Sequence, residues 1–148
     1  MIHNLKAPLL RPGIERDEWV LEEDWAFYSK RLGEEVTIKK GFKSDLDSVP
    51  RIPIVYSQLK GYARLAAIAH DFLYASGYTI QYTTGTPHKE TKVSRKTADA
   101  IFLDLMVCEK IGPIRRRVIW FGVRVGGWVS YKPSVNKIIN RYYRLPKG

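Results

Sequence analysis

The sequence predicts a small α+β domain, and three observations lead to this prediction. Residues 18–28 and 35–42 are rich in strand-favouring residues. Residues 61–76 and 95–106 carry apolar side chains at helical spacing, and a basic, aromatic helix is predicted over residues 114–125. A chain of 148 residues, of which 45% are hydrophobic and 27% charged, suits one compact globular domain.

The domain organisation follows from where these patterns begin and end. Pro8 and the turn-like Arg11-Pro12-Gly13 precede any periodic pattern, so we expect an irregular N-terminal arm over residues 1–17. The core is expected over residues 18–130. Residues 131–148 form a basic, aromatic tail.

The first predicted element is an N-terminal β-hairpin made by residues 18–28 and 35–42, with a turn over residues 31–34. A loop over residues 41–51 is expected to follow, because proline stops regular structure there. This loop carries two carboxylates, Asp45 and Asp47. Charged loops beside a helix are common locations for functional sites.

The helical core is predicted to contain an inserted β flap. The first helix enters near Gly61 and is ended by Gly77. Strand-like and turn-like residues then predict a flap over residues 78–93. Ser94 is the expected N-cap of the second helix.

Two glycine-containing pairs mark the expected ends of the later helices. The second helix is expected to end around Gly112-Pro113. The third helix is amphipathic, and Gly126-Gly127 is expected to end it.

The net charge of +10, from 25 Lys and Arg against 15 Asp and Glu, favours a polyanionic partner. An anionic membrane surface or an acidic protein partner fits this charge. Nucleic acid ranks below them, because no helix-turn-helix, zinc or RNA-binding pattern accompanies the basic residues.

The protein is expected to be made and kept soluble. The sequence shows neither a signal peptide nor an apolar run of transmembrane length. A single cysteine, Cys108, excludes an intramolecular disulfide framework and is expected to be a small core residue.

An adjacent His70-Asp71 pair lies inside the apolar first helix, where unpartnered ionisable groups are costly. Helical spacing places His70 and Tyr74 on one face and turns Asp71 about 100° away. If the two helices pack antiparallel, Asp99 would accept a hydrogen bond from His70 and leave the other ring nitrogen free to take a proton from water. Tyr74 would steady the Asp99 carboxylate.

The second carboxylate of the pair suggests a metal site. Asp71, together with Asp45 or Asp47 of the preceding loop, would supply the hard oxygen ligands that suit Ca²⁺. Such a cation would polarise a substrate carbonyl. The sequence thus predicts a catalytic group of His70, Asp99 and Tyr74 beside a calcium site.

Each of these features also has a purely structural interpretation. A buried His-Asp pair that bridges two helices can serve only to set their register. Asp45 and Asp47 can cap a turn, and the third helix can be amphipathic with a solvated basic side. A metal-dependent phosphohydrolase would need further histidine ligands, and only His3 and His88 remain.

The two helix motifs resemble a known enzyme core. Residues 66–74 and 98–102 look like the catalytic helices of phospholipase A2, especially the parvoviral capsid enzyme and the small bacterial and fungal enzymes. The resemblance implies that His70 is the general base for water, that Asp71 binds calcium and that Asp99 orients the histidine. The Asp45-Leu46-Asp47 loop differs from the glycine-rich calcium loop of those enzymes.

The wider chain, over residues 19–130, resembles a family of uncharacterised phage proteins. The shared motifs are Gly41-Phe42-Lys43-Ser44-Asp45 with Ser48-Val49-Pro50-Arg51, then His70-Asp71-Phe72-Leu73-Tyr74, then Arg95-Lys96-Thr97-Ala98-Asp99. We therefore expect a phage-encoded, phospholipase-A2-like lipid ester hydrolase that assists membrane passage. The alternative is a non-catalytic virion structural or accessory protein of the tail, connector or baseplate.

Overall fold

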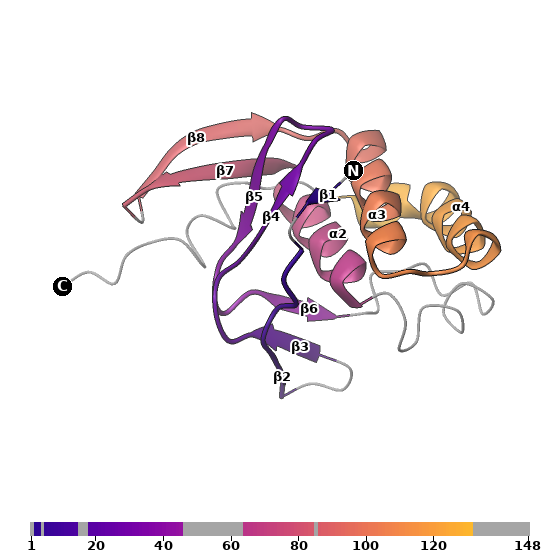
Figure 1. Cartoon of the computed structure of the whole chain (residues 1–148), viewed down its shortest axis with the longest axis horizontal. Helices are drawn as coiled ribbons and strands as arrows, with labels where there is room; N and C mark the ends of the chain where they lie inside the picture. The colour runs from indigo at the N-terminus through magenta and orange to yellow at the C-terminus, as the bar shows by residue number, and fades with distance from the viewer. Residues whose placement is uncertain (1, 4, 15–17, 46–63, 85, 132–148) are drawn as a thin grey trace.

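The computed structural model describes residues 2–3, 5–14, 18–45, 64–84 and 86–131, and it confirms the α+β class (Figure 1). The strands are β1 (Ile2–His3), β2 (Leu10–Pro12), β3 (Glu18–Leu21), β4 (Trp25–Ser29), β5 (Glu34–Ile38), β6 (Lys43–Asp45), β7 (Tyr78–Thr83) and β8 (Thr86–Lys92). The helices are α2 (Arg64–Ser76), α3 (Arg95–Cys108) and α4 (Pro113–Ser130).

The strands form three antiparallel groups, ordered β1-β4-β5, β2-β3-β6 and β7-β8. Figure 1 shows β4 and β5 on one side of α2, with α3 and then α4 on the other side. The β7–β8 hairpin lies beside β5, where the Gln81 side-chain amide donates to the Glu35 carbonyl at 2.6 Å. The predicted flap over residues 78–93 is thus a hairpin, and it extends the β surface.

The predicted N-terminal hairpin is present as β4 and β5, which pair from Trp25 opposite Ile38 to Ser29 opposite Glu34. The prediction of one continuous strand over residues 18–28 is wrong, because Glu22, Glu23 and Asp24 separate β3 from β4. Asp24 accepts hydrogen bonds from the Lys40 backbone amide and the Lys39 ammonium group, both at 2.8 Å. These bonds hold the chain at the bend between the two strands.

Two other predictions about the N-terminal third are corrected. The arm over residues 1–17 is not irregular, because β1 pairs with β4 and β2 pairs with β3. The segment over residues 41–51 is not all loop, because Lys43–Asp45 forms β6 against β3. Isolated stretches of two or three residues carry too little periodicity to be recognised, and pairing with a neighbour is what makes them strands. Residues 46–51 lie outside the described residues.

Helix α2 ends as predicted, and Ser94 caps α3 as predicted. Gly77 has a positive φ of 67° and its amide donates to the Leu73 carbonyl at 2.8 Å, an arrangement that closes a helix with a left-handed residue. The Ser94 hydroxyl accepts from the Thr97 amide at 3.2 Å. The predicted helix entry near Gly61 lies outside the described residues.

Both later helices end elsewhere than predicted. Helix α3 ends at Cys108, and Lys110 adopts the left-handed conformation with φ 58°, ahead of the expected Gly112-Pro113. Helix α4 continues through Gly126-Gly127 to Ser130. Tertiary contacts explain this continuation: the Arg95 guanidinium donates to the Arg124 carbonyl at 3.0 Å, near the point where the glycines would otherwise weaken the helix.

The core lies between the strands and the helices. Inward-facing side chains of β4 and β5, such as Phe27 and Val36, meet the almost wholly buried α2. Helix α3 contributes Ile101, Phe102 and Leu105 to the same cluster. Because α2 is buried on nearly all sides, His70 and Asp71 also lie inside the protein.

Candidate functional site

The site is built by the antiparallel packing of α2 and α3. Glu109, just past the end of α3, accepts from the backbone amides of Leu65 and Ala66 at 3.0 and 3.3 Å. This contact sets the start of α2 against the end of α3. The last turns of α2 are thereby placed against the first turns of α3, where Asp99 lies.

Asp99 is at the centre of the site and is completely buried. Its Oδ1 atom lies 2.8 Å from His70 Nε2 and accepts from the Tyr74 hydroxyl at 2.5 Å. The structure therefore brings together all three side chains of the predicted catalytic group. Their proximity follows from the i, i+4 spacing of His70 and Tyr74 on α2.

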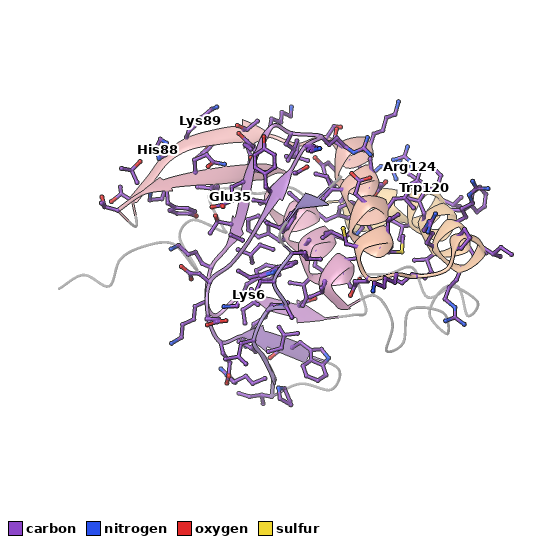
Figure 2. All side chains as sticks on the ribbon, in the orientation of Figure 1. Lys6, Glu35, His88, Lys89, Trp120 and Arg124 are labelled. Carbon is purple, nitrogen blue, oxygen red and sulfur yellow. The ribbon has the colours of Figure 1, made fainter. Side chains whose placement is uncertain are left out.

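Helix α4 adds a residue that the sequence did not reveal. Arg124 donates from Nη1 to Asp99 Oδ2 at 2.7 Å, and Arg95 Nη1 lies 4.0 Å from the same oxygen. Figure 2 labels Arg124 on α4. The solvated basic side expected for the third helix is therefore corrected at Arg124, which points inward to Asp99. Its position depends on how α4 packs, and the sequence offers no signal for that.

The charge state of the Asp99 carboxyl follows from its partners. Burial acts to raise its pKa, but the hydrogen bonds from His70, Tyr74 and Arg124 together outweigh burial and hold the pKa below its usual value. Asp99 is therefore ionised and can only accept hydrogen bonds. The proton between it and His70 must then be carried by His70 Nε2.

The His70 imidazole is neutral near pH 7. Burial lowers its pKa, and this effect outweighs the opposing hydrogen bond and charge of Asp99. A neutral ring that donates from Nε2 keeps a lone pair on Nδ1, which is the state required of a general base.

Aromatic rings surround the imidazole. The Tyr74 ring centroid lies 3.9 Å from that of His70, and the Phe102 centroid lies 4.7 Å away. Tyr131 packs edge-on against Tyr74 and donates its hydroxyl proton to the Val93 carbonyl at 2.9 Å. Burial, aided by the Asp99 carboxylate, raises the pKa of the Tyr74 hydroxyl. Tyr74 therefore stays protonated and donates to Asp99 throughout the physiological range.

Asp71 faces a different neighbour, as its position on the helix predicts. It is 8% exposed, and its Oδ2 accepts a hydrogen bond from the Ser44 hydroxyl. Ser44 lies on β6, so this contact joins α2 to the sheet. Ser44 was not among the predicted site residues, although it lies next to the predicted ligand Asp45.

The described residues supply only part of the ligand set that was predicted for calcium. The backbone of Asp45 pairs with Glu18 on β3, whereas Asp47 lies outside the described residues. Within the described part of the chain, no group of three or more His, Cys, Asp or Glu residues could hold a metal ion. Asp71 and Ser44 alone do not satisfy the six to eight oxygen ligands of Ca²⁺, so no chemical step is derived through a metal.

None of the helices in the described part of the chain is both long enough and apolar enough to cross a bilayer.

Comparison with known proteins identifies the family. Residues 19–123 match the model of the DUF1353 family, described as proteins of unknown function. The match covers more than half of the chain, so the chain belongs to this family. Neither the curated proteins nor the solved structures contain a significant match.

Proposed function

We propose that this member of the DUF1353 family hydrolyses lipid esters, with His70 as the general base and Asp99 as the residue that orients it. One observation supports the proposal above all. The neutral His70 ring donates from Nε2 to a fully buried, ionised carboxylate at 2.8 Å, which leaves Nδ1 as a proton acceptor. Helix spacing places His70 and Asp99 in the core. The Asp99 carboxylate is surrounded by four side chains, those of His70, Tyr74, Arg124 and Arg95, which is more than packing requires.

In the proposed reaction, His70 Nδ1 takes a proton from water as the water oxygen attacks the ester carbonyl. The tetrahedral intermediate collapses, the ester C–O bond breaks, and the proton held by the imidazolium passes to the departing alkoxide. The products are a fatty acid and an alcohol. Asp99 stabilises the transient imidazolium, since its negative charge lies 2.8 Å from Nε2.

Tyr74 and Arg124 act as positioning residues in this scheme. Tyr74 donates to the oxygen that also faces His70, and Arg124 occupies the other oxygen at 2.7 Å. Together they fix the plane of the carboxylate and hence the direction of the imidazole. The proposal predicts that their loss impairs the orientation of His70 more than it impairs substrate binding.

A second candidate function is that of a non-catalytic virion structural or accessory protein. The burial of His70, which is only 4% exposed, favours this candidate, because a general base must meet water. Here the carboxylate network would set the register of three helices. Three further parts of the proposal rest on the sequence alone. The motifs support a phage origin and a place in the particle or the host cytoplasm. The basic charge supports contact with anionic lipid or with other particle proteins.

The deciding experiment measures fatty acid release from anionic phospholipid vesicles by the wild type and by His70→Ala. We expect a loss of at least about 100-fold in rate for the variant. The matched control is His88→Ala, because His88 is exposed on β8 and contacts the Thr83 hydroxyl at 3.0 Å. Equal release by wild type and His70→Ala, with both proteins folded by circular dichroism, would remove the hydrolase and favour the structural candidate.

The calcium prediction is tested in the same assay. Release is compared with calcium, with magnesium and with a chelator, using the wild type and Asp71→Asn. A calcium site at Asp71 predicts that the chelator abolishes release and that Asp71→Asn raises the calcium concentration needed. Full activity with the chelator would leave the histidine mechanism intact but would exclude the metal.

A further inference from the structure

Helix α4 exposes a row of apolar side chains that has no counterpart elsewhere on the described helices. Its members are Ile114, Val118, Phe121 and Val125, which are 80%, 38%, 65% and 53% exposed. We call these four residues the α4 seam. Large exposed apolar groups that lie contiguously mark surfaces for a partner.

The spacing of the seam is that of a helix–helix contact. Its members follow one another at intervals of four, three and four residues, as the d, a, d and a positions of a heptad do. At 100° per residue the four side chains fall within about 60° of the helix circumference. The opposite face of α4 carries the buried Ile119 and Val123, so the seam is not needed for the core.

The width of the seam indicates whether it is suited to a partner helix or to a lipid surface. A helix that lies in a membrane interface presents a wide apolar face, whereas a row of a and d positions forms a narrow seam against one other helix. Over the described side chains of α4, the seam has this narrow form. Figure 1 shows α4 at the end of the molecule away from the β7–β8 hairpin.

Charge defines which helix would fit. Arg115 and Arg117 are exposed and occupy the e and g positions that flank the seam. No Asp or Glu follows Glu109, while residues 110–148 hold ten Lys and Arg. Residues 1–109 hold fifteen basic and fifteen acidic residues, so the whole net charge of +10 comes from the segment that contains α4.

We propose that the α4 seam is the docking site for an acidic amphipathic helix of a partner protein. A second copy of this chain is disfavoured, because pairing two α4 helices would bring together two seams that each carry Arg115 and Arg117 on their flanks. A partner with apolar a and d residues and Glu at e and g matches both the seam and its flanks. This docking is independent of the hydrolase, since His70 and Asp99 are not part of the seam.

The probe is a synthetic helix of about four heptads with Leu at a and d and Glu at e and g, where repulsion between glutamates limits self-pairing. Binding to the full chain is measured by calorimetry. The variants are Phe121→Ser in the seam and Arg117→Glu on its flank. The matched controls are Leu9→Ser, at a residue 52% exposed outside the helices, and a peptide with Lys in place of Glu.

We expect the acidic peptide to bind the wild type and Leu9→Ser equally. Phe121→Ser and Arg117→Glu should each weaken binding by at least about tenfold, and the Lys peptide should not bind. Arg117→Glu should instead accept the Lys peptide, a rescue that a misfolded variant cannot show.

Three results would overturn the proposal. The first is absence of binding by the acidic peptide, or equal binding by all variants. The second is dimerisation of the wild type in sedimentation that Phe121→Ser abolishes, which would assign the seam to a second copy. The third is binding to anionic vesicles that Phe121→Ser abolishes without any binding of the peptide, which would assign the seam to a lipid surface.

Discussion

Asp99 concentrates the polar interactions of the protein interior in one carboxylate. It is fully buried and takes hydrogen bonds from His70, Tyr74 and Arg124, which come from α2 and α4. A buried charge with this many partners is tolerated. Without the Asp99 carboxylate, the buried side chains of His70 and Tyr74 would lose their hydrogen-bond acceptor. Stability and the proposed chemistry therefore depend on the same residue.

Replacing Asp99 by Asn should destabilise the protein by about 3–5 kcal/mol, because it removes a fully buried negative charge that pairs with Arg124 and His70. The measurement is urea unfolding followed by circular dichroism. Asp104→Asn is the control on the same helix. Asp104 pairs with the Arg31 guanidinium at 2.9 Å, and Arg31 is 43% exposed, so we expect a loss of about 1 kcal/mol or less. Equal losses in the two variants would contradict the central role of Asp99.

The buried imidazole should make stability depend on pH. Its folded pKa is lowered below the ordinary 6.5, so between these two values the unfolded chain binds a proton that the folded protein does not. Stability should thus fall as the pH falls from 7 through 6.5 towards 5. The lowered pKa of Asp99 acts in the same direction at lower pH, once the pH approaches 3.8.

His70→Gln should remove the loss between pH 7 and 5 while the rest of the curve remains. Each unit by which the pKa is lowered corresponds to about 1.4 kcal/mol. Glu109, whose pKa burial raises, acts in the opposite direction near pH 5, but it is present in both proteins and cancels in the comparison. Unfolding midpoints in urea across this pH range provide the measurement. Parallel curves for the two proteins would show that His70 does not titrate as described.

At the scale of elements, the turn at the end of α3 closes that helix and also caps the start of α2. Lys110 donates to the Val107 carbonyl at 3.0 Å and Ile111 donates to the Met106 carbonyl at 3.1 Å, which is the Schellman pattern of helix closure. Glu109 at the same turn caps the first amides of α2. One turn therefore ends one helix and starts the other, and it aligns the two helices that carry the site.

Glu109→Ala should destabilise the protein by about 1–2 kcal/mol, because two amides of α2 lose their acceptor. Thermal unfolding followed by circular dichroism would measure the loss. Glu90→Ala, at an exposed position of β8, is the control and should change stability by less than about 0.5 kcal/mol. A neutral outcome for Glu109→Ala would mean that water replaces the carboxylate at no cost.

The same turn offers a stabilising change. Lys110 holds a left-handed conformation that glycine adopts without steric cost, so Lys110→Gly should gain about 0.5–1 kcal/mol. Thermal unfolding of the variant beside the wild type would measure the gain. A loss of stability would indicate that the Lys110 side chain supports the turn.

At the scale of the whole molecule, the N-terminal residues join the two three-stranded sheets. Strand β1 lies beside β4, β2 lies beside β3, and the Lys6 carbonyl between them accepts from the Trp25 indole at 2.7 Å. Leu5 and Leu10 pack against the core from this segment. The segment therefore acts as part of the domain and not as an arm.

Removal of residues 1–12 should cost about 3 kcal/mol, from the burial of Leu5 and Leu10 and the indole hydrogen bond. Urea unfolding measures the loss. The control is Lys6→Ala, which keeps the carbonyl that Trp25 uses and should change stability by less than about 0.5 kcal/mol. Unchanged stability after truncation would restore the original prediction of an irregular arm.

The sequence by itself determined the α+β class, the helices around His70 and Asp99, and the flap hairpin. These features depend on periodicity and capping, which are local: Ser94 and Gly77 are helix-end signals in the neighbouring sequence, and i, i+4 spacing puts His70 and Tyr74 on one face. The contact of His70 with Asp99 also required the two helices to pack antiparallel.

Only the tertiary structure decided the rest. The short strands β1, β2 and β6 exist because a neighbour supplies hydrogen bonds, α4 passes through two glycines because its sides are held, and Lys110 closes α3 without the expected glycine. The inward turn of Arg124 to Asp99, and the exposure of the seam on the same helix, depend on how α4 rotates against α3. That rotation is set by packing between distant residues, which no local pattern encodes.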